Sequence, residues 1–303
     1  MIGNSRLHWA VLSGDAVLEA WDSEHLGRIR QELQEEGVGE YVNSPCGEGG
    51  IPVYLLSAKA RTLGDTQVEL RAEDGQAERK VAFYPSRGRF RVASVVPAEL
   101  DRWILRCPDI VPILSRHAIS GTDLYPTLGV DRALAVRGAA LKWGWPVLVV
   151  DCGSALTFTA GTRDRRLGGG AILPGLRLQL MALANHTAQL PRVALPDELP
   201  PRWAMSTVEA IQSGVIWSIV GGIRGFVEDW LLTQRSMHDE GGALTVVFTG
   251  GDSKVLHKAI LDVWKCGQCD HHVMSRVQLK LVGEVIHWGI ASVVLEEGDL
   301  ASA

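Results

Sequence analysis

An acidic residue followed by a small-residue turn is the feature of this sequence best suited to chemistry on an anionic substrate. Asp151 follows four consecutive apolar residues, Val147 to Val150, and precedes Gly153 and Ser154. This pattern predicts a buried strand that ends in a tight turn, and a second strand from Leu156 to Ala160 would complete a hairpin. Backbone N–H groups at such a tip can approach an anion while Asp151 holds a cation. The stretch indicates a phosphate and metal site, although an ordinary β-turn has the same residue types.

A second acidic candidate, Asp131, is predicted to lie in the first turn of a helix from Asp131 to Trp143. Gly144 would stop this helix, and the loop-forming residues Gly121 and Pro126 precede it. In a first helical turn the helix dipole favours a carboxylate, and the free N–H groups face outward. A plain acidic residue at a helix N-terminus is the simpler interpretation.

Two glycine-containing segments could bring their backbone close to a ligand. Leu244 to Thr249 is a predicted strand that leads through Gly250 and Gly251 into a helix from Ser253 to Trp264. A strand, a double glycine and a helix suit a nucleotide that lies against a helix N-terminus. Gly168 to Gly170 predict a flexible turn before a short strand and a further helix, and this turn either approaches a ligand or is an ordinary glycine-rich β-turn.

A capping box at Ser206 to Glu209 opens a long predicted helix that extends to about Thr233. Four glycines inside it each lower helix stability by about 1 kcal/mol relative to alanine. Such glycines indicate the close approach of another helix or subunit. The predicted apolar face consists of Val208, Ile211, Val215 and Ile219, and the glycines are Gly214, Gly221, Gly222 and Gly225.

The composition predicts a globular protein with two domains. The chain has 303 residues, of which 46% are hydrophobic and 21% charged, with a formal net charge of -5. Nothing in it favours nucleic acid as a partner, because the basic residues from Arg163 to Arg166 are few and interrupted by Asp164. No run of eighteen apolar residues and no charged-then-apolar leader is seen, which predicts a cytoplasmic protein without a membrane partner.

The five cysteines are scattered without a framework pattern, which predicts reduced thiols. Cys266 and Cys269 could form half of a zinc site, with His271 and His272 as further ligands, but no second Cys-x-x-Cys completes it. Cys152 is predicted to be a small buried side chain and not a nucleophile.

The N-terminus looks like a second copy of the Asp151 hairpin without its first strand. Gly3 aligns with Gly153, and Asn4 aligns with Ser154, which predicts two related lobes. A strand from Val17 to Trp21 and a helix from Glu24 to Glu36 would follow. Residues 41–91 predict a hairpin insertion, residues 91–96 the next strand, and Pro97 the start of a helix.

Taken in order, these motifs resemble those of type III pantothenate kinase, a member of the actin-like ATPase and sugar-kinase superfamily. The resemblance covers Ile2 to Leu12 and about Ser94 to Gly251. It implies an α/β fold of two ribonuclease-H-like lobes, with mixed sheets flanked by helices around a central cleft. The expected lobes are residues 1–118, with the hairpin insertion at about 41–91, and residues 119–303.

The resemblance also implies an activity: ATP-dependent phosphorylation of pantothenate to 4'-phosphopantothenate, the first step of coenzyme A biosynthesis. It implies ATP, Mg²⁺ and a monovalent cation, K⁺ or NH₄⁺, in a homodimer. Asp131 corresponds to the general base and Asp151 to the cation ligand. The implied pantothenate site is Gly129, Val130, Asp131, Arg132 and Thr207, and the implied ATP site is Gly3, Asn4, Ser5, Arg6, Ser154, Gly250 and Gly251.

One departure from the family pattern concerns magnesium. The family begins with Asp-x-Gly-Asn-Thr, whereas Met1 stands in the place of that aspartate. We expect activity to be reduced and not abolished, because the missing carboxylate helps to hold magnesium beneath the phosphates, whereas Mg²⁺ also binds through water. Two other functions stay open: a non-catalytic accessory or regulatory protein on the same fold, and a kinase of another small alcohol or acid.

Overall fold

The computed structural model describes residues 1, 7–13, 16–23, 61–62, 67–71, 78–82, 91–106, 111–119, 124–237, 244–265 and 276–301. The chain divides into two compact units, one of Met1–Ala10 with Glu19–Ile113 and one of Val11–Leu18 with Leu114–Ala303. Several predictions lie outside the described residues. They concern Gly3 to Arg6, the helix from Glu24 to Glu36, most of the insertion at 41–91, and the Cys266 and Cys269 pair.

The N-terminal part of the chain forms short sheets. β1 and β2 form a two-stranded sheet, β3, β4 and β5 form an antiparallel sheet, and β6 pairs with β7 in parallel. The strand predicted for 91–96 ends at Ala93, because the Ser94 hydroxyl accepts a hydrogen bond from the Val96 N–H at 3.0 Å and turns the chain. The bounds are β1 Leu7–Ser13, β2 Ala16–Ser23, β3 Arg61–Thr62, β4 Gln67–Arg71, β5 Glu78–Ala82, β6 Arg91–Ala93, α2 Pro97–Arg106 and β7 Val111–Ile113.

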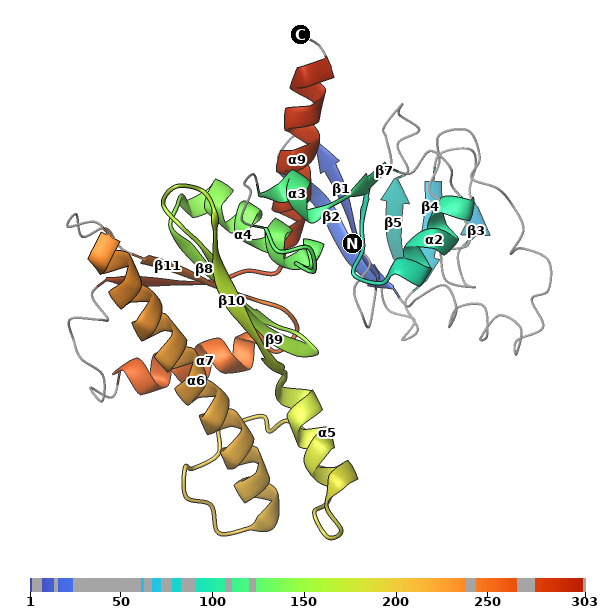
Figure 1. Cartoon of the computed structure of the whole chain (residues 1–303). Helices are drawn as coiled ribbons and strands as arrows, with labels where there is room; N and C mark the ends of the chain where they lie inside the picture. Colours follow the sequence, from blue (N-terminus) through green and yellow to red (C-terminus); the bar gives the residue numbers. More distant parts are fainter. Residues whose placement is uncertain are drawn as a thin grey trace. The chain divides into compact units, whose positions relative to one another are not determined.

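The second unit is built on a five-stranded mixed sheet in the order β10-β9-β8-β11-β12 (Figure 1). β10, β9 and β8 are antiparallel neighbours, whereas β8, β11 and β12 are parallel. The predicted hairpin around Asp151 is confirmed, with Gly153 and Ser154 at its tip. The bounds are β8 Val147–Cys152, β9 Ala155–Gly161, β10 Leu167–Pro174, β11 Leu244–Thr249 and β12 Val277–Leu281.

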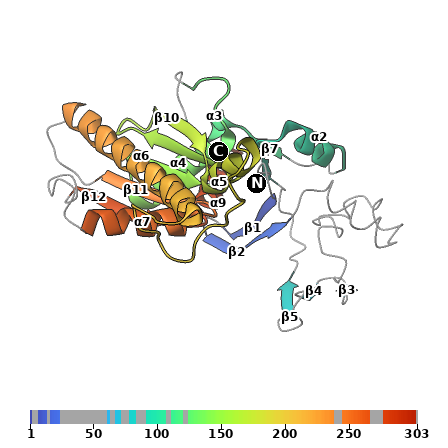
Figure 2. The ribbon, with the colours of Figure 1, turned by 90° about the horizontal axis from the view of Figure 1, so that it is seen from below.

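Helices cover both faces of this sheet. α4 packs on α9 and on β8 and β9, while α7 packs on β8, β11 and β12 and contacts α6 (Figures 1 and 2). Phe158 of β9 stacks on Phe226 of α6 with ring centroids 4.3 Å apart, so α6 and α7 share one face. The bounds are α3 Ser115–Ala118, α4 Val130–Trp143, α5 Leu176–His186, α6 Thr207–Met237, α7 Ser253–Lys265 and α9 Val285–Ala301.

The alternation of side chains along β8 determines which face each residue serves. Leu148, Val150 and Cys152 belong to the core that β8 forms with α6 and α7. Because successive side chains point to opposite faces of a sheet, Asp151 belongs to the face that α4 covers. Thr159 of β9 lies on that face as well, since its hydroxyl accepts a hydrogen bond from a side chain of α4.

α4 and α9 cross in very close contact. A Cβ atom added to Gly138 of α4 would overlap with the carbonyl oxygen of Val285 in α9, and one added to Gly289 would overlap with the carbonyl oxygen of Leu134. Arg137 adds a hydrogen bond from Nε to Ser292 Oγ at 2.7 Å. α9 therefore fixes the position of the helix that carries Asp131.

The sequence predicts a turn at the glycines 168–170, but these glycines lie in β10, which runs from Leu167 to Pro174. The prediction of a flexible turn there was wrong. The strand continues because its backbone pairs with β9 from Gly169 onward, with an irregularity between Leu167 and Gly169. The connecting turn lies earlier, at residues 162–166, where the basic residues are exposed as predicted.

α6 begins as predicted, with the Glu209 N–H donating to Ser206 Oγ at 3.3 Å, and it extends past Thr233 to Met237. Its predicted face is mostly confirmed, but Val208 is exposed because it precedes the part of α6 that reaches the core. A Cβ atom added to any of its four glycines would meet nothing within 4 Å among the described residues. The close approach that those glycines predict is therefore not made within the described part of one chain.

α6 is also long and apolar enough to cross a membrane, from Thr207 to Gln234, by length and composition alone. Its buried side chains, such as Ile216, Ile223 and Val227, belong to the core beneath the sheet. This packing accounts for the apolar character of the helix.

Candidate active site

Asp131 and Asp151 come close together on the α4 face of the sheet. Asp131 is the second residue of α4, and Asp151 is the penultimate residue of β8. They are near enough for the charge of Asp131 to raise the pKa of Asp151. Two residues twenty positions apart therefore form one acidic site, because a strand end and a helix start lie at the same edge.

Asp131 combines burial with a fixed orientation. Its Oδ1 accepts a hydrogen bond from the Arg132 N–H at 2.8 Å. Burial raises the pKa of Asp131, and the Arg132 N–H and charge oppose this shift in part. A carboxylate with a raised pKa is a better proton acceptor than an exposed aspartate, which suits a general base.

Asp151 has the environment of a cation ligand. Burial, and then the charge of Asp131, raise the pKa of Asp151 to about 7. No N–H or O–H group of the described residues donates a hydrogen bond to this carboxylate. A bound cation would therefore balance its negative charge. Within the described ranges no three His, Cys, Asp or Glu side chains cluster to hold a metal. Other oxygens would have to complete the coordination of an ion at Asp151.

Three loops converge beside this acidic pair. The Gly175 N–H donates to the carbonyl oxygen of Ser154 at 2.9 Å, and the Asp252 N–H donates to the carbonyl oxygen of Cys152 at 2.9 Å. Gly250 has a φ of +88°, and a Cβ atom on it would overlap with Asp151 Oδ1. The turn at the hairpin tip is thus held between the β10–α5 and β11–α7 connections, and Gly250 must be glycine.

Arg132 is a buried cation. Its Nε donates to Thr159 Oγ1 at 3.0 Å, its Nη1 to the Tyr125 hydroxyl at 2.8 Å, and its Nη2 to the carbonyl oxygen of Phe158 at 2.9 Å. A Cβ atom on Gly170 of β10 would overlap with the Phe158 carbonyl oxygen and with Arg132 Nη2. The sequence offered this glycine as a ligand approach or a turn, but in the structure it makes room for that carbonyl group and for the guanidinium that binds it.

The loop before α4 is held by local bonds that sequence reasoning missed. The Leu128 N–H donates to the Tyr125 carbonyl oxygen at 3.0 Å, and the Ser115 hydroxyl donates to the Leu128 carbonyl oxygen at 2.7 Å. Pro126 suits the second position of such a turn, because its φ is fixed. The Tyr-Pro pair was the available signal for this turn, but the contact of Tyr125 with Arg132 was not visible in the sequence.

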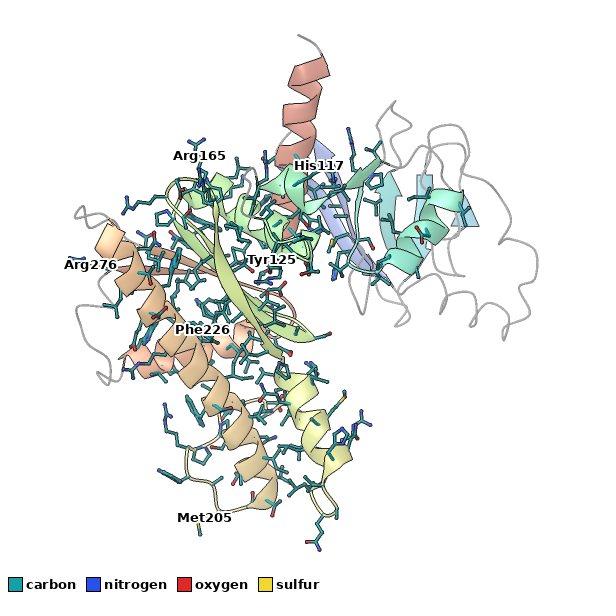
Figure 3. All side chains as sticks on the ribbon, viewed as in Figure 1. His117, Tyr125, Arg165, Met205, Phe226 and Arg276 are labelled. Carbon is teal, nitrogen blue, oxygen red and sulfur yellow. The ribbon has the colours of Figure 1, made fainter. Side chains whose placement is uncertain are left out.

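Thr207 is not part of this site in a single chain. It is exposed at the start of α6, and the neighbouring Met205 lies far from Tyr125 in Figure 3. The other predicted residues of the second unit lie along the edge that Asp131 and Asp151 share. They are Gly129, Val130, Asp131, Arg132, Asp151, Ser154, Gly250 and Gly251.

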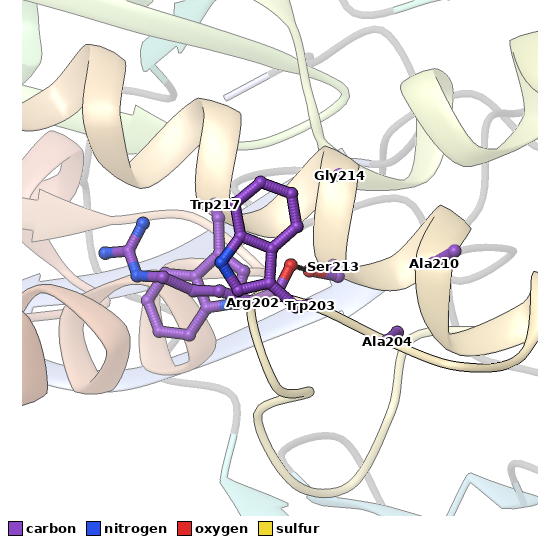
Figure 4. A pocket seen from close by; sticks show the side chains of 7 residues that line it. All are labelled: Arg202, Trp203, Ala204, Ala210, Ser213, Gly214 and Trp217. Carbon is purple, nitrogen blue, oxygen red and sulfur yellow. Dashed lines mark hydrogen bonds between the residues drawn. The ribbon is translucent and has the colours of Figure 1, made fainter.

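A pocket of about 350 Å³ lies near the start of α6, away from the acidic pair (Figure 4). The guanidinium of Arg202 lies over the Trp217 ring, 4.4 Å from its centroid, and the Ser213 hydroxyl donates to the Arg202 carbonyl oxygen at 2.9 Å. None of its side chains is a carboxylate or imidazole that could accept a proton. The lining residues are Arg202, Trp203, Ala204, Ala210, Ser213, Gly214 and Trp217.

Cys152 takes no part in the acidic site. It is buried in the core on the opposite face of β8, and burial raises the pKa of its thiol. The prediction of a small buried side chain is confirmed.

Known proteins support a functional interpretation of this geometry. Residues 55–229 match the family described as Type III pantothenate kinase. The type III pantothenate kinase of Nostoc sp. (strain PCC 7120) is 37% identical over 262 residues, which are 84% of this chain and 81% of that protein. The type III pantothenate kinase of Synechococcus sp. (strain JA-3-3Ab) is 47% identical over 227 residues, 72% and 88% of the two chains.

A more distant likeness is found among solved structures. A conserved Baf family transcriptional activator from Campylobacter jejuni shares 20% sequence identity, with coverage of 78% of this chain and 96% of its own. The TM-score is 0.46.

Proposed function

Since this chain belongs to the type III pantothenate kinase family, we propose which of its residues transfer the phosphate from ATP to pantothenate. The chain is an ATP-dependent kinase that phosphorylates pantothenate in coenzyme A biosynthesis. The observation that carries the assignment of residues is the meeting of Asp131 with Asp151 beside the Gly153 turn.

In this proposal Asp131 is the general base. The primary hydroxyl oxygen of pantothenate attacks the γ-phosphorus of ATP, the bond from that phosphorus to the β,γ-bridging oxygen breaks, and the hydroxyl proton moves to Asp131. Such transfers depend mainly on positioning and charge neutralisation. The hydrogen bond from the Arg132 N–H fixes one carboxylate oxygen, so the second is left to face the hydroxyl.

We assign the carboxylate of pantothenate to Arg132. Its guanidinium is buried and donates only to uncharged oxygens among the described residues, namely those of Thr159, Tyr125 and Phe158. One N–H on each Nη remains after these bonds, since a guanidinium has five donors. An anionic substrate would balance the buried charge and accept these bonds, which supports a substrate role for the loop from Gly129 to Arg132.

For ATP, the support comes from the convergence of loops around Ser154 and Gly250 with the N-termini of α5 and α7. Backbone N–H groups at helix starts favour phosphate. We also place Gly251 in the ATP site. Gly3 to Arg6 lie outside the described residues, and we place them in this site on the family resemblance alone. Mg²⁺ bound with ATP would offset part of the phosphate charge at this site.

The deciding assay measures ADP formation with and without pantothenate, in potassium or ammonium buffers. We expect ADP only when pantothenate is present. ADP formation with a different small alcohol or acid, and not with pantothenate, would indicate another substrate. No ADP under any condition would favour an accessory or regulatory role on the same fold.

The monovalent cation proposed at Asp151 leads to a prediction about stability. The raised pKa means that the folded chain keeps a proton on Asp151 up to about pH 7, whereas the unfolded chain releases it near the ordinary value of 3.8. Stability therefore falls as pH rises from about 4 to 7, by up to about 4 kcal/mol. In tetramethylammonium buffer at pH 8, Asp151→Asn should melt at a higher temperature than the unsubstituted chain, and at pH 4 the difference should vanish.

Potassium supplies the control for this prediction. Adding K⁺ at pH 8 should raise the melting temperature of the unsubstituted chain, because the ion neutralises the buried carboxylate, and should leave Asp151→Asn unchanged. An equal response of both proteins would exclude Asp151 as the ligand.

We propose a homodimer in which Thr207 reaches the pantothenate site of the second copy. Thr207 is exposed and remote from Asp131 within one chain, so a role in substrate binding requires another chain. The exposed glycines of α6, with open space around Gly221 and Gly225, supply a surface that another helix can approach.

Mixing two inactive variants tests this arrangement. Thr207→Ala and Asp131→Asn should each lower activity, and dimers that contain one copy of each should regain it, because one of their two sites would have both Thr207 and Asp131. The measurement is pantothenate-dependent ADP formation after the variants are mixed and reassembled. Mixed dimers no more active than the separate variants would contradict the shared site.

The division into lobes at about residue 118, with the insertion at 41–91, remains a proposal, as does the cytoplasmic location. The compact unit that contains Leu114–Ala303, together with Val11–Leu18, supports the boundary near residue 118. The packing of the buried α6 side chains Ile216, Ile223 and Val227 into the core of the second unit supports the cytoplasmic location.

A further inference from the structure

A second charged pair lies close to the phosphate turn and has no part in the transfer as described. Arg177 Nε donates to Asp252 Oδ1 at 3.0 Å. Arg177 belongs to the first turn of α5, and Asp252 immediately precedes α7. The pair therefore joins the two connections that enclose the hairpin tip.

The backbone around this pair is tied directly to the tip. The Asp252 N–H bonds the carbonyl oxygen of Cys152, and the Gly175 N–H bonds the carbonyl oxygen of Ser154. A Cβ atom on Gly175 would overlap with the carbonyl oxygen of Gly153, so no side chain separates α5 from the turn. Arg177 is thus two residues from Gly175, whose backbone contacts the proposed phosphate site.

The two partners differ sharply in exposure. The Asp252 side chain is 8% exposed, whereas the Arg177 side chain is 70% exposed. A nearly buried carboxylate that holds one end of an exposed guanidinium fixes its direction and leaves the Nη atoms accessible. Because most of the Arg177 side chain lies in solvent, its charge is screened and adds little to the stability of the fold, so the guanidinium is available to a ligand.

The local charges indicate what the guanidinium would bind. Asp131, Asp151 and Asp252 are all acidic and lie at this edge, and the triphosphate of ATP adds more negative charge. Arg132 is turned into the α4 face by its bonds to Thr159 and Phe158. Arg177 is therefore a described cation that can face the nucleotide on the α5 and α7 side.

We propose that Arg177 binds a phosphate oxygen of ATP and that Asp252 is the positioning residue for its guanidinium. This inference rests on the proposed function, because it takes Ser154 and Gly250 as the nucleotide site. Arginine suits the role, since its planar donor fork matches phosphate geometry and it stays charged at any working pH.

Calorimetric titration of the full chain with ATP, ADP and adenosine tests the contact. Arg177→Gln should weaken binding of ATP and ADP by about tenfold or more, the usual loss for one charge-assisted hydrogen bond. Binding of adenosine should not change. Arg177→Lys should retain part of the affinity because it keeps the charge. In steady-state assays the KM for ATP should rise in Arg177→Gln while the KM for pantothenate stays the same.

Arg165→Gln is the matched control, because Arg165 is exposed in the turn between β9 and β10, at the opposite end of these strands from the hairpin tip. It should leave all three titrations unchanged. As a single substitution, Asp252→Asn should weaken ATP binding. In the double variant with Arg177→Gln it should weaken ATP binding little further, because the acid acts through the arginine.

Two results would overturn the inference: unchanged ATP affinity in Arg177→Gln, or an equal loss of adenosine binding, which would mean a distorted loop. A loss of ATP binding by Asp252→Asn that is fully additive with Arg177→Gln would remove the positioning role. Failure of the unsubstituted chain to bind ATP, or to phosphorylate pantothenate, would instead count against the proposed function.

Discussion

Replacing Asp131 with asparagine should lower kcat for pantothenate phosphorylation by about 10²–10⁴-fold, the usual effect of losing a general base. The amide keeps the size of the side chain and can still accept the hydrogen bond from the Arg132 N–H, so the start of α4 should stay in place. It cannot accept the proton of the attacking hydroxyl. The measurement is kcat from ADP formation at saturating ATP and pantothenate, together with the Kd for ATP, which should change little.

Asp197→Asn is the matched control, because Asp197 is exposed in the segment before α6 and should tolerate the same substitution. The pH profile adds a second check. Burial raises the pKa of Asp131. On acidification, the activity of the unsubstituted enzyme should therefore begin to fall at a higher pH than it would with an aspartate of ordinary pKa. Unchanged kcat in Asp131→Asn would remove this residue from proton transfer.

The largest effect on folding is expected for Gly138→Ala. The added Cβ atom would overlap with the Val285 carbonyl oxygen, and its next nearest contact is the Gly289 backbone nitrogen. Neither can rotate away as a side chain would, so α4 and α9 would have to move apart. Overpacking of this kind usually costs about 1–3 kcal/mol and sometimes more, which outweighs the roughly 1 kcal/mol that alanine gains over glycine in a helix.

The measurement is the free energy of unfolding from denaturant titration, which should fall by about 2 kcal/mol or more in Gly138→Ala. Gly289→Ala should behave alike, because its Cβ atom would overlap with the Leu134 carbonyl oxygen. Leu141→Ala changes an exposed position of the same helix and should have a small effect. Stability equal to that of the unsubstituted chain in both glycine variants would show that the helices can separate without loss.

The local elements of the second unit could be predicted from the sequence because apolar runs, glycines and caps report on the chain nearby. Val147 to Val150 and Leu244 to Thr249 are long β-branched or apolar runs, and both are central strands. Gly144 ends α4 with a φ of +81°, as its place after the last helical residue predicts. The order of these motifs was also sufficient for the family resemblance, which the relatives confirm.

The errors arose where a residue type has several uses. The glycines at 168–170 predict a turn, yet they lie in β10, and Gly170 leaves room for the Arg132 guanidinium. No local pattern distinguishes these uses, because the partner is 38 positions away and on another element. Val208 fits the apolar period of α6 but lies before the helix reaches the core.

The sequence by itself determined most strands and helices of the second unit and which residues carry charge. Only the tertiary structure decided that Asp131 faces Asp151, that Asp252 holds Arg177, and that Thr207 is remote from both pairs. The physical reason is that hydrophobic periodicity fixes which face of each element is buried, whereas the pairing of faces depends on packing between distant segments. A crossing as close as that of Gly138 with α9 depends on where two backbones meet, which neither helix specifies alone.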